Sequence, residues 1–76
     1  MTMMSDRRAK DDIVEIDRHP LGLVIYRFRY RAEFADRYGS GPDIGVMADE
    51  VAERYPDSVS RRSDGYLMVD YGRLFG

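Results

Sequence analysis

Ser5 and Lys10 are the two residues of this sequence whose types and spacing could do chemistry together. A serine hydroxyl is a poor nucleophile until a base removes its proton, and a lysine can be that base when desolvation lowers its pKa. Charged N-terminal segments often contain both residue types, so the pair alone is weak evidence for a nucleophile and its base.

The five-residue spacing of this pair limits how it can be arranged. On a helix, side chains five residues apart are separated by roughly 140° about the axis, and on a strand they lie on opposite faces. A working dyad therefore requires a turn between the two residues, or a lysine supplied by a neighbouring subunit. The intervening charges of Asp6, Arg7 and Arg8 predict that Lys10 is hydrated, whereas a basic lysine needs desolvation.

Other chemistries find little support in the composition. The chain has 76 residues, no cysteine and a single histidine, His19, which argues against disulfides, thiolate metal sites and structural zinc. His19 precedes Pro20 in a predicted turn and is interpreted as a surface or capping residue. With 14 acidic residues, a carboxylate pair such as Glu15 and Glu50 is expected by chance. We therefore expect no metal and no cofactor.

Residues 23–31 form the clearest predicted strand. The side chains alternate with a period of two, which places aromatic residues on one face and arginines on the other, namely Tyr26, Phe28 and Tyr30 against Arg27, Arg29 and Arg31. Aromatic residues beside arginines are typical of single-stranded nucleic-acid platforms, but residues on opposite faces cannot hold one ligand. The net charge of −2 also argues against a nucleic-acid partner.

The C-terminal half predicts a helix followed by a hairpin. Apolar residues at positions 48, 51, 52 and 55 have the spacing of one buried helical stripe, and Pro56 ends that helix. Two short strands, residues 58–61 and 66–70, flank an Asp64–Gly65 pair that supplies a tight turn. Residues 71–75 could begin a second helix.

The N-terminal half predicts less regular structure. Residues 1–12 are polar and are expected to be a flexible segment that carries the Ser5 and Lys10 pair, ahead of a single domain over residues 13–76. Residues 19–22 predict a turn, and residues 32–43 are rich in turn formers and predict a loop. The sum is an α+β fold, in which a small antiparallel sheet with a C-terminal hairpin packs against one helix.

The size of the chain favours self-association. A domain this short buries only about 60% of its unfolded surface, and without disulfides or metal, oligomerisation is the remaining means of stabilisation. No apolar run approaches the ~20 residues of a membrane span, and the N-terminus lacks the apolar stretch of a signal peptide. We therefore expect a soluble protein, folded in a cytoplasm and with no membrane partner.

Five sequence blocks in a fixed order carry a resemblance to a known family. The first is a Ser-Asp-x-x-x-Lys-x-x-Ile motif, and the last is an Asp-Gly-Tyr-x-x-Val-Asp-Tyr motif. The blocks cover residues 5–13, 26–30, 44–51, 55–59 and 64–71. Together they resemble the intramolecular chaperone domain of endosialidases and phage tail fibres, also called the peptidase S74 family.

This resemblance implies a role and a set of site residues. Domains of this family lie at the C-terminus of trimeric fibres or spikes, help three chains fold in register and are then released by self-cleavage. It implies that Ser5 is the nucleophile, Lys10 its base and Met4–Ser5 the bond that is cut. The partners would be further copies of the chain, as a homotrimer, and a phage tail fibre or spike protein. The location would be the bacterial host cytoplasm during assembly, or the virion tail.

Three functions stay open from the sequence. The chain could be an assembly chaperone of a phage or prophage tail, a static structural cap or adaptor without proteolytic activity, or an active self-cleaving protease. Only residues 1–4 precede Ser5 in this sequence, so we expect the Met4–Ser5 bond to be mobile. Much of a rate depends on held geometry, and we expect the isolated chain to keep this bond intact or to cleave it slowly.

Overall fold

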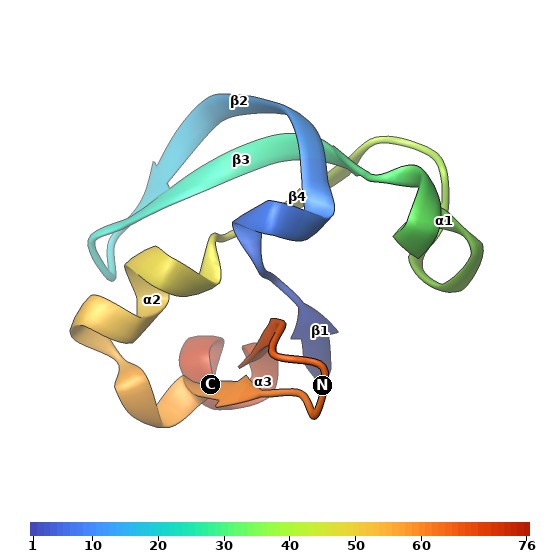
Figure 1. Ribbon diagram of the computed structural model, residues 1–76. Helices are drawn as coiled ribbons and strands as arrows, with labels where there is room; N and C mark the ends of the chain where they lie inside the picture. The colour runs from blue at the N-terminus through green and yellow to red at the C-terminus, as the bar shows by residue number, and fades with distance from the viewer.

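Two antiparallel three-stranded sheets and three short α-helices make up the fold (Figure 1). The computed structural model describes all residues from Met1 to Gly76. In chain order the elements are β1 (Thr2–Met4), η1 (Arg7–Ala9), β2 (Lys10–His19), β3 (Leu23–Tyr30), α1 (Ala32–Tyr38), β4 (Asp43–Gly45), α2 (Ala48–Arg54), η2 (Pro56–Ser58), β5 (Val59–Arg61), β6 (Leu67–Asp70) and α3 (Tyr71–Phe75). The predicted α+β class is confirmed, with one more sheet and more helices than expected.

The first sheet has the order β2–β3–β4 and contains the predicted aromatic strand at its centre. Phe28 and Tyr30 are only 3% and 7% exposed, whereas Arg27 and Arg29 are exposed. The predicted two faces of this strand are therefore confirmed. The expected turn after His19 joins β2 to β3, and Gly22 adopts a φ of 83°, which glycine tolerates without strain.

The second sheet has the order β1–β6–β5 and joins the two ends of the chain. The predicted hairpin forms its β5–β6 pair, with Gly65 at a φ of 91° in the turn. Strand β1 pairs with the other edge of β6, with Met4 opposite Met68. Residues 1–12, expected to be flexible, instead contribute to both sheets: β1 pairs with β6 from the far end of the sequence, and Lys10 begins β2, which pairs with β3.

The segment expected to be a loop after β3 begins with helix α1. Its apolar residues pack on aromatic neighbours: the Phe34 and Tyr66 ring centroids lie 4.9 Å apart, and those of Tyr38 and Tyr30 lie 5.2 Å apart. The turn formers Gly39 to Pro42 follow the helix rather than replacing it. Tertiary packing of two aromatic residues therefore outweighs the weak local signal.

The helix predicted over residues 48–55 is confirmed as α2, which contacts both sheets. Its residues Ala48 and Val51 are completely buried, and Val51 belongs to a core cluster with Leu23 of β3 and Val69 of β6. Figure 1 shows α2 beside the two sheets, with β2, β3 and β4 on one side and β5 and β6 on the other. No helix of the structure is long and apolar enough to cross a bilayer.

A second core cluster surrounds the N-terminal segment. It consists of Met4, Ala9, Phe28, Tyr30 and Met47. The cluster therefore combines the residues next to Ser5 and Lys10 with the aromatic face of β3. The expected core thus extends to the segment that was predicted to carry the chemistry.

Candidate functional site

The Ser5–Lys10 segment crosses from one sheet to the other and turns sharply on the way. Strand β1 ends at Met4, the 3₁₀ turn η1 follows, and β2 begins at Lys10. The side chain of Asp6 caps this turn by accepting a hydrogen bond of 2.8 Å from the Arg8 amide. The turn that the five-residue spacing requires is therefore present within one chain.

Hydrogen bonds hold the Met4–Ser5 peptide on both sides. The Met4 carbonyl accepts a hydrogen bond of 2.8 Å from the Tyr30 hydroxyl, and the Ser5 amide donates to the Leu67 carbonyl at 3.1 Å. The Ser5 carbonyl in turn accepts from the Ala48 amide at 2.8 Å. Met4 is 1% exposed and Ser5 is fully buried. The bond expected to be mobile is instead fixed within the core.

The two polar side chains of the predicted dyad are buried but are not hydrogen-bonded to each other. The Ser5 hydroxyl donates to the Met3 carbonyl at 3.1 Å, while Lys10 Nζ donates to the Val46 carbonyl at 2.9 Å. The Ser5 carbonyl and Lys10 Nζ both bind the segment 46–48, through the Ala48 amide and the Val46 carbonyl. The structure thus brings both residues to the same short segment, in a resting arrangement.

Because it is buried, Lys10 holds its proton less tightly than an ordinary lysine does. Lys10 is 4% exposed, and its ammonium lies 3.9 Å from the centroid of the Phe28 ring. Desolvation, with a smaller contribution from the positive charge of Arg7, lowers the pKa of Lys10 from 10.5 to about 8. A substantial neutral fraction is therefore available slightly above neutral pH, as a general base requires.

The predicted hydration of Lys10 by its charged neighbours is corrected by the structure. Arg7 pairs with Asp49 and Glu50 at 3.2 and 3.0 Å, both on α2. Arg8 pairs with Asp6 at 2.8 Å. Each of these arginines is thus paired with a carboxylate, and Lys10 is buried rather than hydrated.

Tyr30 is the site residue that the sequence analysis missed. The alternation of residues 23–31 predicts only that Tyr30 lies on the buried face of its strand. Burial raises the pKa of the Tyr30 hydroxyl, so it stays protonated and remains a donor in the range where Lys10 loses its proton. A buried strand residue with a hydroxyl is a weak signal by itself, and only the packing of β3 against the end of β1 brings it to the Met4 carbonyl.

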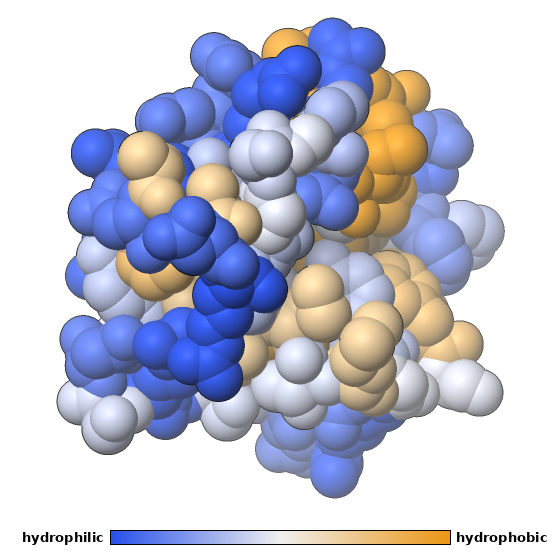
Figure 2. Space-filling view, turned by 90° about the vertical axis from the view of Figure 1, so that its right-hand side faces the viewer, coloured by the Kyte–Doolittle hydropathy of each residue, from blue (hydrophilic) through white to orange (hydrophobic).

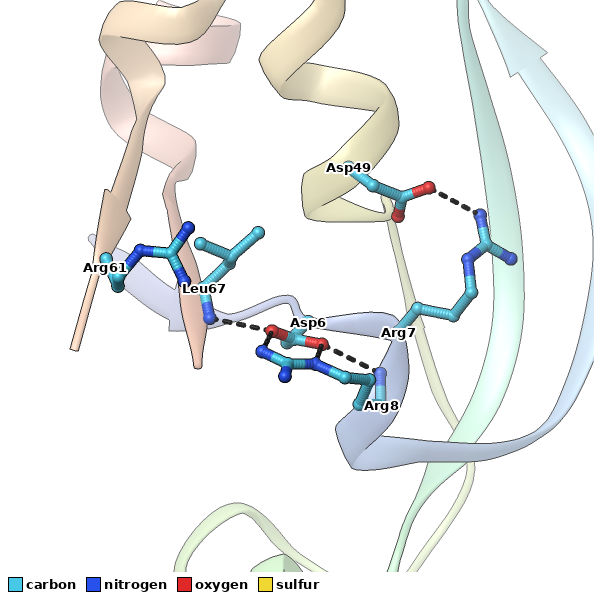
Figure 3. Close-up of a pocket in the computed structure, with 6 residues that line it drawn as sticks. All are labelled: Asp6, Arg7, Arg8, Asp49, Arg61 and Leu67. Carbon is cyan, nitrogen blue, oxygen red and sulfur yellow. Dashed lines mark hydrogen bonds and ion pairs between the residues drawn. The ribbon is translucent and has the colours of Figure 1, made fainter. Parts of the chain in front are cut away.

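A polar groove of about 420 Å³ lies on the outer side of η1 (Figure 3). Asp6 lies at its centre and accepts two hydrogen bonds from the Arg8 guanidinium, at 3.0 and 2.8 Å, and one of 2.9 Å from the Leu67 amide. The hydrogen bonds from Arg8 are the main reason that the pKa of Asp6 falls to about 2. Asp6 therefore ties η1 to β6 and positions the residue before it, Ser5.

The family model for the chaperone of endosialidase, peptidase S74, matches residues 5–60. The chain belongs to this family. The resemblance seen in the sequence is thus confirmed over most of the chain, and the S74 match begins at Ser5. No solved structure matches the chain. The S74 intramolecular chaperone domain is typical of phage tail fibre assembly.

The last block of the sequence resemblance lies beyond the matched residues but contacts the S74 region closely. The Tyr71 hydroxyl accepts a hydrogen bond of 3.1 Å from the Val46 amide, next to the carbonyl that binds Lys10. The Asp70 side chain caps α3 by accepting from the Arg73 amide at 3.1 Å. The end of the chain therefore supports the segment on which Lys10 rests.

Proposed function

We propose that this S74 domain is an assembly chaperone for a phage tail fibre or tailspike, that it promotes the folding of three chains together, and that it cuts its own Met4–Ser5 bond. Membership of the chaperone family supports the first part of this proposal. The fixed Met4–Ser5 peptide and the buried lysine, which binds the same segment 46–48 as Ser5, support the second.

The cleavage follows an acyl shift within the chain. The Ser5 hydroxyl oxygen adds to the Met4 carbonyl carbon, and neutral Lys10 takes the hydroxyl proton. The Met4–Ser5 carbon–nitrogen bond then breaks, and the departing nitrogen receives the proton from Lys10. The resulting ester joins Met4 to the Ser5 oxygen. Water hydrolyses it, giving a carboxylate on Met4, and a hydroxyl and a free amine on Ser5.

The observation that carries the proposed cleavage is the burial of Lys10 without an acidic partner. None of the ion pairs in the structure includes Lys10. Its ammonium donates to the Val46 carbonyl and, at 3.9 Å, to Met47 Sδ, and it lies over the Phe28 ring. A lysine is almost never fully buried unless it is paired, and groups with pKa values shifted in this way cluster at functional sites.

The resting arrangement makes cleavage slow in the isolated chain. The Ser5 hydroxyl must leave the Met3 carbonyl, and Lys10 Nζ must leave the Val46 carbonyl, before the two can meet. We infer that docking onto a client fibre and the assembly of three chains favour this change. The cut would then follow assembly.

A static cap or adaptor of a phage tail, without proteolysis, is the second candidate function. It is favoured by one observation, the absence of a hydrogen bond between the Ser5 hydroxyl and Lys10 Nζ. In that case the buried lysine would only anchor β2 to the Val46 carbonyl.

Intact-mass measurement over time tests the self-cleavage. We expect loss of residues 1–4 at a rate that rises with pH through about 8, the pKa of Lys10, because the neutral lysine is the active form. Lys10→Arg stays charged throughout this range and should abolish the loss, as should Ser5→Ala. The matched control Ser60→Ala changes an exposed serine of β5 and should cleave normally. A wild-type chain that stays whole at every pH, alone and with the tail protein, would overturn the self-cleavage. Folding of the tail protein with and without this chain would then separate an assembly chaperone from a static cap.

A further inference from the structure

The Tyr30 hydroxyl lies where negative charge would develop during cleavage. It donates a hydrogen bond of 2.8 Å to the Met4 carbonyl oxygen. When a nucleophile adds to that carbonyl carbon, this oxygen becomes an oxyanion. Donors fixed in advance at such a position stabilise the transition state, because they need no reorganisation as the charge appears.

We propose that Tyr30 is a further catalytic residue, whose hydroxyl stabilises the Met4 oxyanion as the Ser5 oxygen adds to the carbonyl carbon. This inference rests on the self-cleavage proposed above and adds the third group that the reaction requires. Ser5 supplies the nucleophile, Lys10 moves the proton, and Tyr30 holds the oxygen.

Strand pairing explains why the Met4 oxygen is directed at Tyr30. The β1–β6 pairs run from Thr2–Asp70 to Met4–Met68, and at either end of them the Tyr71 amide donates to the Met1 carbonyl and the Ser5 amide to the Leu67 carbonyl. Met1 and Ser5 therefore mark the hydrogen-bonded positions of this strand. Antiparallel pairs alternate between hydrogen-bonded and non-hydrogen-bonded positions. Met4 and Met68 therefore occupy a non-hydrogen-bonded pair, and the Met4 carbonyl points away from β6 and toward the other sheet.

Packing holds the Tyr30 ring in this orientation. Its centroid lies 5.2 Å from that of Phe28, with the rings nearly perpendicular at 86°, and 5.2 Å from that of Tyr38. The residue is 7% exposed. A buried phenol between two rings has little rotational freedom, so its hydroxyl is a preorganised donor.

The same burial keeps the hydroxyl protonated when the base is active. Burial raises the pKa of Tyr30 above its usual value and lowers that of Lys10. Because the two shifts go in opposite directions, there is a range of pH above about 8 in which lysine is neutral and tyrosine still donates. Burial in the same core thus favours the neutral form of Lys10 as a base and the protonated form of Tyr30 as a donor.

The test compares the cleavage rates of Tyr30→Phe and Tyr26→Phe in the full chain by intact mass. Tyr26 also lies on β3, but its hydroxyl donates to Glu50 at 2.7 Å, so this variant is a matched loss of one hydroxyl. We expect Tyr30→Phe to lower the plateau rate by about 100-fold while the midpoint of the pH profile stays at that of the wild type. Tyr26→Phe should cleave at the wild-type rate.

A second variant keeps the proposal testable if Tyr30→Phe does not fold. Fluorotyrosine placed at position 30 alone preserves the shape of the residue and makes its hydroxyl a stronger donor, so cleavage should accelerate. A wild-type rate in every Tyr30 variant that folds would overturn the role of Tyr30 and leave the self-cleavage intact. A wild-type chain that never cleaves, alone or with the tail protein, would overturn the self-cleavage, and the role of Tyr30 with it.

Discussion

Lys10 and Tyr30 lie directly opposite each other in the antiparallel β2–β3 pair. Side chains at such paired positions share one face of the sheet and lie close together. Both residues face the interior, at 4% and 7% exposure. One cross-strand pair therefore presents a base and a hydrogen-bond donor to the segment that β1 brings from the second sheet.

The stability of the protein should rise with pH because of Lys10. Its pKa is about 8 in the folded protein and 10.5 ordinarily, so between these values the unfolded chain binds the proton more readily. The free energy of unfolding should therefore increase across this range, by about 3 kcal/mol in total. Chemical denaturation at several pH values measures the slope, and Lys10→Met should remove it. Equal slopes in the two proteins would contradict the burial of a charged lysine.

Acid should destabilise the protein through Asp6. Its pKa is about 2 in the folded protein against 3.8 ordinarily, so its contribution is complete above pH 4 and is lost as the pH falls through about 2. We expect Asp6→Asn to cost about 2 kcal/mol at neutral pH and to weaken the acid transition. Asp57→Asn is the control, because that side chain is 86% exposed. If denaturation gave both variants the same stability, the anchoring of η1 by Asp6 would be refuted.

Substitutions at Val51 and Arg29 should have opposite consequences. Val51 is completely buried in α2, and an unpaired carboxylate there costs several kcal/mol, so Val51→Asp should unfold the domain. Arg29 lies on the solvated face of β3, and Arg29→Ala should change stability by no more than about 0.5 kcal/mol. Thermal unfolding measures both effects. Similar melting temperatures for the two variants would contradict the assignment of Val51 to the buried face of α2 and of Arg29 to the solvated face of β3.

The protein should self-associate, as a trimer, through the outer face of the first sheet. Ile44 and Val14 are 66% and 44% exposed and flank Arg27 on adjacent strands. Figure 2 shows the most hydrophobic side chains gathered at the upper right of the face, with paler apolar ones at the left and lower right among hydrophilic ones. Sedimentation should detect the trimer at tens of micromolar, and Ile44→Glu should dissociate it. Ser60→Glu, at an exposed position of the second sheet, should not. A wild-type chain that sediments as a monomer would disprove this.

Local patterns predicted the central strand, α2 and the C-terminal hairpin because each has a clear period or turn signal. They failed for α1, whose aromatic residues find partners far along the chain. They failed again for residues 1–12, since polarity suggested exposure there. Asp6 is buried because the Leu67 amide, distant in sequence, donates to it at 2.9 Å. Contacts between residues so far apart in the chain produce no periodic pattern in the sequence.

The candidate site was predicted in part. Ser5 and Lys10 stood out by type and by family motif, and the structure buries both. Tyr30 could not be assigned, because its role depends on the register of β2 against β3 and on the direction of the Met4 carbonyl. Both are properties of paired strands, and neither can be read from one strand.

Strand β1 lies entirely on the N-terminal side of the Met4–Ser5 bond, yet it is one of three strands in its sheet. A cut at this bond would leave β1 without a covalent link to the rest of the domain, held to it by its pairing with β6. Its departure would uncover the edge of β6, and the fold that remains would differ from the fold that made the cut. The reaction would therefore be irreversible, because the cleaved domain would lack the strand that positions the Met4 carbonyl.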